Sequence, residues 1–271
     1  MNEYLTKVTV MRKLGLLGVL WAVLSTLLST LVATSVAAEP LKICTDTNFW
    51  YPFTYVKDGK SVGLQLDIIS SAAEKTGVSI EYTALPWKRC LKEAENGSYD
   101  GIAVASYKDA RAEFMHYPAD AATAKRSVQR VMQVEYVVVT PTSNNYEYNG
   151  DVATLPTPVR VPRGYSIADD LKKKGVDVDS GAPGDENNIK KMLRAGKGSL
   201  VTLPKIVEVL GARPEFEGKM KVSAKPLKSK SYYLTFSKKG KATAATRQKL
   251  WNEIAVVRED TVFMEAASSK Y

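Results

Sequence analysis

The chain has 271 residues, of which 45% are hydrophobic and 25% charged, and its formal net charge is +9 at pH 7. This composition is globular, gives enough length for one large or two smaller domains, and excludes a disordered chain. One histidine, His116, and two cysteines leave too few ligands for a closed Cys/His zinc site. The sequence lacks the Gly-x-Ser-x-Gly elbow of serine hydrolases and the glycine-rich loops of nucleotide-binding proteins, so it predicts no cofactor.

Residues 1–38 have the layout of a secretory signal peptide. Two basic residues precede an apolar stretch over 14–32, and small residues lead up to Ala38. A positive start, an apolar middle and a small-residue exit are typical of exported proteins. We therefore expect cleavage near Ala38 and a periplasmic mature chain. An uncleaved anchor is the alternative, because about 19 apolar residues could just span a bilayer, and Met11 is an alternative start to Met1.

Export bears on the charge and on the two cysteines. Removing 1–38 takes away three basic residues and one acidic residue, which leaves a net charge of +7. The lysines and arginines are scattered, which predicts a solvated surface and no nucleic-acid partner. Cys44 and Cys90 both lie in the exported part, where thiols are oxidised. The pair is compatible with a disulfide, and two buried free thiols are the alternative.

The first part of the exported chain alternates strands and helices. Short apolar runs predict strands, and apolar residues three or four apart predict helices. Pro86 opens the second helix, and glycines follow both helices. The predicted elements are a strand at 41–45, a helix at 64–75, a strand at 78–84, a helix at 87–95 and a strand at 100–105. This order is typical of an α/β unit with parallel strands.

The α/β order returns later in the chain, after a different kind of segment. A long β-branched run at 131–140 has no helix behind it, which suits a strand that crosses between two lobes. The elements that follow are a helix at 167–174, a strand at 176–178, a helix at 187–194, a strand at 199–202, a returning strand at 231–237, and terminal helices at 243–257 and 261–268. Two α/β lobes joined by long crossing segments leave a cleft, the usual place for a small-molecule site.

Several short motifs follow one another in an order that carries a family resemblance. They are Thr45-Asp46-Thr47, Tyr51-Pro52-Phe53-Thr54-Tyr55, Asp58-Gly59-Lys60, Gly63-Leu64-Gln65-Leu66-Asp67, Trp87, Gly97, Asp100-Gly101, Ala110-Arg111 and Arg258-Glu259-Asp260-Thr261. In this order and spacing they resemble family 3 periplasmic solute-binding proteins, the polar amino-acid receptors of ABC importers. The resemblance covers nearly all of residues 41–268 and is strongest in the first lobe.

The resemblance implies the two-lobe periplasmic-binding-protein fold, an α/β fold of the type II kind. Lobe 1 is then discontinuous, with residues 39–130 and 229–271, and lobe 2 has residues 131–228. Two crossing segments join the lobes, and the ligand cleft lies between them. Such receptors close by hinge motion around the ligand.

The resemblance also implies a set of ligand-binding residues in lobe 1. Arg111 matches the family's partner of the ligand carboxylate, and a guanidinium fork is the group best suited to that role. Ser106 matches a hydroxyl that donates to the same carboxylate. Trp87 matches an aromatic that stacks on the ligand, and either Phe49 or Trp50 supplies the opposing wall.

Further ligand contacts are implied at the ends of strands in both lobes. Asp46 ends the first strand, where related receptors for basic amino acids place an acid. Residues Gly164-Tyr165-Ser166 open a helix in lobe 2 and match the family's second carboxylate contact. One departure stands out, because segment 200–205 has no acid where amino-acid receptors place one for the ligand ammonium. Either Asp185 or Glu208 takes that role, or the ligand lacks an α-amino group.

The implied fold brings the two cysteines to the same edge of lobe 1. Cys44 lies near the end of the first strand and Cys90 in the first turn of the second helix. This placement permits a disulfide, which needs a Cα separation of about 4.4–6.8 Å.

The sequence therefore predicts a binding protein without catalysis. We expect an exported monomer that captures a small polar ligand, an amino acid or a related carboxylate, and delivers it to the membrane permease of an ABC importer. An exported dehydratase on the same fold is one alternative, and its general acid would be Asp46, Glu135 or His116. A ligand sensor for a membrane signalling partner is another.

Overall fold

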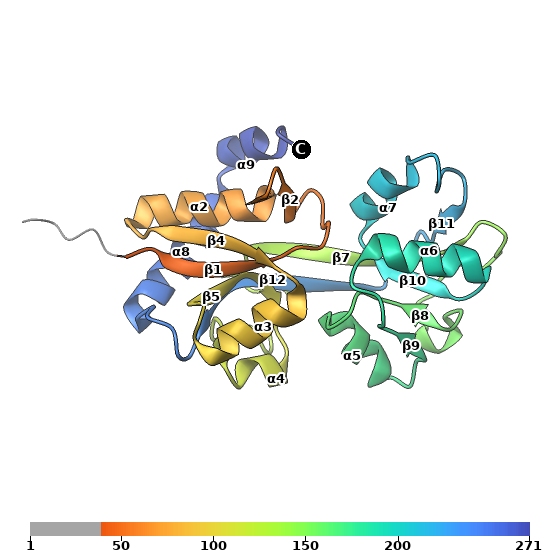
Figure 1. Cartoon of the computed structure of the whole chain (residues 1–271), viewed down its shortest axis with the longest axis horizontal. Coiled ribbons are helices and arrows are strands. Elements are labelled where there is room, and N and C mark those ends of the chain that lie inside the picture. Colours follow the sequence, from red (N-terminus) through yellow and green to blue (C-terminus); the bar gives the residue numbers. More distant parts are fainter. Residues whose placement is uncertain (1–38) are drawn as a thin grey trace, which may run out of the picture. The chain divides into compact units, whose positions relative to one another are not determined.

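The computed structural model describes residues 39–271, which form one compact unit (Figure 1). The predicted signal peptide lies outside the described residues. Within residues 39–271, no helix combines the length and apolar character needed to cross a membrane.

The helices and strands alternate through most of the described chain. The strands are β1 (Leu41–Asp46), β2 (Tyr55–Lys57), β3 (Lys60–Val62), β4 (Ile80–Leu85), β5 (Gly101–Ser106), β6 (Met115–His116), β7 (Met132–Pro141), β8 (Val159–Arg160), β9 (Val178–Asp179), β10 (Ser199–Thr202), β11 (Met220–Val222) and β12 (Lys228–Ser237). The helices are α2 (Leu64–Thr76), α3 (Trp87–Asn96), α4 (Asp109–Ala112), the 3₁₀ turn η1 (Val152–Thr154), α5 (Ser166–Lys172), α6 (Asp185–Ala195), α7 (Pro204–Gly211), α8 (Ala244–Glu259) and α9 (Thr261–Ser268).

One sheet runs through both lobes. Its strand order over residues 39–271 is β4-β1-β5-β12-β7-β10-β8-β9, with β6 on β12 and β11 on β7. The outer strands are parallel in each lobe: β4-β1-β5 in lobe 1, and β10-β8-β9 in lobe 2. β12 and β7 are antiparallel to each other and join the two sets, and Figure 1 shows them running between the lobes. The two-lobe α/β prediction is confirmed, whereas the boundaries 39–130, 131–228 and 229–271 stay a prediction.

Burial explains why these segments form the elements that they do. The inner parallel strands are apolar and largely buried, as in the fully buried β5, whereas the edge strand β4 is only half-buried. In lobe 1 the chain passes from β1 to β4 through α2, and from β4 to β5 through α3. Because β4 and β5 flank β1 on opposite sides, right-handed crossovers place α2 and α3 on opposite faces of the sheet (Figure 1). The terminal helix α8 packs against α2, and its Trp251 donates a 2.7 Å hydrogen bond to the carbonyl of Leu234 in β12.

The structure adds elements that the sequence analysis did not predict. They include β6, β11, the short α4, and α7, which follows β10 with Pro204 in its first turn. The returning strand, predicted at 231–237, begins at Lys228. The strand begins three residues before the predicted start because residues 228–232 pair with β7. Their polar side chains gave no sign of this pairing in the sequence.

The disulfide prediction is confirmed. Cys44 in β1 and Cys90 in α3 are bonded, with a Cα separation of 5.7 Å. Both side chains are fully buried. The bond ties the first strand of lobe 1 to the helix that begins at Trp87, a predicted site residue.

Candidate functional site

A small cavity lies where the carboxyl ends of the parallel strands of the two lobes face each other. Its volume is about 30 Å³, room for one or two water molecules. Lobe 1 contributes the ends of β1 and β5 and the start of α3, and lobe 2 contributes the start of α5. The lining residues are Asp46, Trp50, Thr54, Trp87, Val104, Ser106, Arg111, Tyr165, Ser166 and Tyr232. This is the position in which open α/β sheets bind ligands.

Direct contacts between the lobes close the cleft in this structure. The indole nitrogen of Trp87 donates a 3.1 Å hydrogen bond to the carbonyl of Gly164. The hydroxyls of Ser106 and Ser166 lie 2.7 Å apart. The hydroxyl of Tyr165 donates to Asp46 Oδ2 at 3.0 Å. The structure is therefore a closed form in which groups of lobe 2 bind the groups of lobe 1 that face the cleft.

Arg111 is a buried cation at one end of the cavity. It lies in α4 directly after β5 and is 5% exposed. Its guanidinium donates to the carbonyl of Ser106 at 2.9 Å and to that of Gly164 at 3.0 Å, and its carbon lies 5.0 Å from the ring centre of Trp87. These partners are neutral, and no carboxylate of residues 39–271 forms an ion pair with Arg111. The site thus holds a positive charge in a form that an anionic group can neutralise.

Three aromatic rings line up across the cleft. Tyr165 from lobe 2 lies between Trp50 and Trp87 of lobe 1, with ring centres 6.5 Å and 6.3 Å away and edge-on geometry. Phe49 does not line the cavity and stacks on Tyr51 instead. Of the two residues predicted for the second wall, the structure therefore favours Trp50.

One carboxyl group borders the cavity, and a second is buried close enough to feel its charge. Asp46, the last residue of β1, has its pKa raised to about 6 because desolvation outweighs its hydrogen bonds. Asp185, the first residue of α6, is 4% exposed, and desolvation raises its pKa to about 7. The Asp46 charge adds to this rise. Thr202 opposes it, although neither Asp185 Oδ1 nor Thr202 Oγ1 forms a hydrogen bond of normal geometry.

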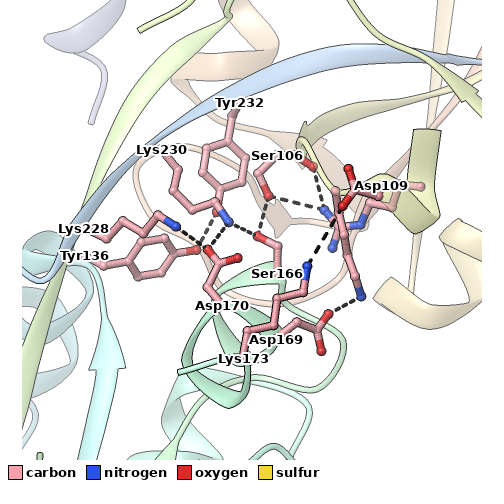
Figure 2. A network of polar contacts seen from close by, with 12 residues as sticks. Ser106, Asp109, Tyr136, Ser166, Asp169, Asp170, Lys173, Lys228, Lys230 and Tyr232 are labelled. Atoms are coloured by element: carbon pink, nitrogen blue, oxygen red, sulfur yellow. Dashed lines mark hydrogen bonds and ion pairs between the residues drawn. The ribbon is translucent and has the colours of Figure 1, made fainter. Parts of the chain in front are cut away.

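A polar network continues from Ser166 along one rim of the cleft, as Figure 2 shows. Lys230 on β12 donates to Ser166 Oγ at 2.7 Å and to Asp170 Oδ2 at 2.8 Å. Burial lowers the pKa of Lys230 to about 8, and Asp170 opposes that shift. Tyr232, also on β12, forms a hydroxyl–hydroxyl hydrogen bond with Tyr136 of β7. The crossing strands therefore contribute polar groups to the cleft, and they are not only connections.

Seven of the nine predicted ligand-binding residues surround the cavity: Asp46, Trp50, Trp87, Ser106, Arg111, Tyr165 and Ser166. Gly164 lies beside them and contributes its carbonyl, while Phe49 lies elsewhere. Contact of these residues with a ligand stays a prediction.

The sequence analysis missed Thr54, Val104 and Tyr232. Tyr232 pairs with Ser106 across β12 and β5, so only the strand register could have revealed it.

Other residues named from the sequence do not reach the cavity. His116 pairs with Phe236 at the far end of β12, and Glu135 is exposed on β7. Glu208 is exposed on α7 and is paired with Lys205. Of the acids named for the dehydratase alternative, Asp46 alone borders the cavity.

Comparison with known families identifies the chain. The model of the bacterial extracellular solute-binding proteins, family 3, matches residues 41–255. The chain belongs to this family. A comparison with curated protein sequences found no match.

Solved structures share the fold of this family 3 protein. A histidine kinase sensor domain with similarity to periplasmic binding proteins superposes with a TM-score of 0.71 at 14% identity, over 87% of this chain and 96% of that domain. The GluR0 ligand-binding core from Nostoc punctiforme, in complex with L-glutamate, gives a TM-score of 0.64 at 14% identity, over 86% and 99%. An ancestral arginine-binding protein bound to glutamine gives 0.65 at 16% identity, over 86% and 97%. At these identities the likeness shows the fold alone.

Proposed function

We propose that this protein is an exported receptor that binds a small polar ligand bearing a carboxylate between its lobes and delivers it to the permease of an ABC importer. The observation that carries the proposal is the Arg111 guanidinium. It is buried at the junction of the lobes, it borders the cavity, and among residues 39–271 its partners are neutral groups. A carboxylate that replaced the Gly164 carbonyl would give it a charged partner with fork geometry.

The surroundings of Arg111 support the same assignment. The hydroxyls of Ser106 and Ser166 come from different lobes and meet beside the guanidinium, so one carboxylate can accept from both lobes and hold them together. The similar GluR0 ligand-binding core and ancestral arginine-binding protein were solved with L-glutamate and with glutamine, respectively, and both ligands carry a carboxylate.

A binding screen tests the proposal. The purified protein is screened by thermal shift against amino acids, polyamines and organic acids, since a ligand of the native state raises the melting temperature. We expect carboxylate-bearing compounds to bind, and Arg111→Lys to weaken them at least tenfold because the bidentate fork is lost. The control is Arg89→Lys, an exposed arginine of α3 in an ion pair with Glu93. Unchanged affinity in Arg111→Lys would contradict the carboxylate assignment.

Sensing is a second candidate, because the similar solved structures include a histidine kinase sensor domain. Uptake of the labelled ligand separates the two roles. We expect uptake to stop when the gene is deleted and to return with the wild-type copy. Normal uptake in the deletion strain would instead favour a sensor. The same cells test export, since the periplasmic form is expected to begin at Glu39.

A further inference from the structure

A second, larger groove lies beside the cleft and is lined in part by the charged residues of Figure 2. Its volume is about 790 Å³, a size typical of small-molecule sites, and it shares no lining residue with the cavity at Arg111. Lobe 1, both crossing strands and lobe 2 contribute to its walls. Six basic side chains line it: Lys108, Lys125, Arg126, Lys173, Lys228 and Lys230.

The acids of the groove neutralise only part of this positive charge. Three acids line it, and they are Asp109, Asp169 and Asp170. Asp170 is shared, because its Oδ2 lies 2.8 Å from the ammonium groups of both Lys228 and Lys230. Burial and the charge of Lys228 lower the pKa of Lys230, although Asp170 opposes them. At pH 7 the groove therefore has an excess of three positive charges, and its cations repel one another.

Lys125 and Arg126 are the cations that the acids leave over. The other four basic residues of the groove each pair with one of its acids, whereas these two are exposed and form no ion pair within residues 39–271. Their segment is fixed to the crossing strands. Gln133 of β7 donates to the carbonyl of Lys125 at 3.2 Å, and the backbone of Ser127 donates to Ser231 Oγ at 3.2 Å. Because the backbone is already held, an anion that binds these cations orders little further chain.

The chemistry of the groove fits a multiply charged oxyanion. Ammonium and guanidinium groups are the side chains that bind phosphates and carboxylates. Lysines act as point charges on flexible stems, so several of them together select for total charge more than for one planar group. The excess of three positive charges matches an anion with three negative charges.

We propose that this groove is a second binding site of the protein, which takes a small trivalent oxyanion, a polyphosphate or a polycarboxylate. The site is separate from the one proposed for the transported ligand. It therefore goes beyond the proposed function and does not depend on it.

Calorimetry with pyrophosphate and with citrate tests the assignment, on the purified protein at pH 7 and low ionic strength. We expect saturable binding to one site that an equal concentration of acetate does not displace. The double variant Lys125→Gln, Arg126→Gln should weaken binding at least about fivefold, because two of the six cations are lost. Neither side chain forms a hydrogen bond or an ion pair in the described chain, so the variant is expected to fold.

Two further variants serve as controls. Lys57→Gln, Lys60→Gln also removes two exposed cations, which are paired in register across β2 and β3 and do not line the groove. Arg111→Lys changes the cavity and leaves the lining of the groove intact. Both should bind pyrophosphate and citrate with the affinity of the wild type.

The outcomes decide the proposal. Binding of either probe that is weakened in the groove variant alone supports the site, and the tighter probe shows whether phosphate or carboxylate oxyanions are its ligands. Equal losses in the groove variant and in Lys57→Gln, Lys60→Gln would show that net charge alone attracts the anion, and would overturn the site. A loss in Arg111→Lys alone would place the anion in the cavity and overturn it as well. No binding of either probe overturns the second site and leaves the carboxylate receptor standing.

Discussion

At the residue scale, the cleft separates its charges by position. Arg111 borders the cavity without an ion-pair partner, Asp46 borders it without a cation, and the buried Asp185 behind it also lacks one, as far as the described residues show. Unpaired buried charges reduce the stability of the protein itself. Functional sites keep such destabilising charges, because a bound ligand with the complementary charges compensates them.

The cost of Asp185 predicts a pH-dependent stability. Its pKa is raised from 3.8 to about 7, so the native state prefers the protonated acid. This contribution is fully present below pH 3.8 and is lost as the pH rises through 7. We expect Asp185→Asn, which stays neutral, to be more stable than wild type at pH 8, by at most about 4 kcal/mol, and the difference to vanish below pH 3.8.

Urea denaturation of the ligand-free protein at several pH values measures this difference. Asp177→Asn is the control, because Asp177 is exposed in the same lobe. A variant that is less stable than wild type at pH 8 would show that Asp185 has a stabilising partner, contrary to the structure.

Residue chemistry also explains which site residues the sequence could reveal. Some site residues lie at the end of a strand or in the helix that follows it, so the α/β pattern itself brings them to the cleft; these are Asp46, Trp87, Ser106 and Arg111. Tyr232 could not be found in this way, because its place depends on the pairing of β12 with β5, far apart in the chain.

At the element scale, helices and strands with local sequence signals were predictable, and those that depend on pairing with distant segments were not. The elements of 41–105 were predictable because each has clear apolar spacing and a glycine or proline at its boundary. Helix α7 was missed because its sequence, Pro204–Gly211, is short and its N-cap residue is the apolar Leu203, which provides no capping side chain. The first residues of β12 are polar and partly exposed, so pairing with β7, not local preference, makes them a strand.

The disulfide between β1 and α3 predicts a large change in stability. It closes a loop with a sequence separation of 46 residues. Such a link restricts the unfolded chain, and its loss typically costs about 2–4 kcal/mol. We expect the double variant Cys44→Ser, Cys90→Ser to lose about this much free energy of unfolding in urea titrations. Reductant should destabilise the wild type to a similar degree and leave the variant unchanged. Equal stability of the two proteins would contradict a structural role for the bond.

At the scale of the whole described unit, ion pairs along one rim hold lobe 2 against lobe 1 and the crossing strand. Lys108 of lobe 1 pairs with Asp169 of α5, and Asp109 lies 4.0 Å from Lys173. Figure 2 shows Asp170 of α5 between Lys228 and Lys230 of β12, each 2.8 Å away. Burial tends to raise the pKa of Asp170, but these two ammonium groups outweigh it, and the net shift is downward. The rim thus favours the closed form electrostatically.

The closed form should therefore be sensitive to salt and to Asp170. Partly exposed pairs contribute up to about 1 kcal/mol each. Of the two Asp170 pairs, only the one with Lys230 joins predicted lobe 2 to a residue outside it, so Asp170→Asn should shift the open-to-closed ratio of the ligand-free protein up to about fivefold toward opening. Small-angle X-ray scattering would then show a larger radius of gyration. High salt should increase the radius of gyration of the wild type more than that of the variant, because the variant has fewer ion pairs to screen.

The control is Glu95→Gln. It breaks the exposed Lys92–Glu95 pair of α3, away from the rim, and should change neither the radius of gyration nor its salt dependence. If Asp170→Asn keeps the wild-type radius at every ionic strength, hydrogen bonds and packing at the cleft, not the ion pairs, maintain closure.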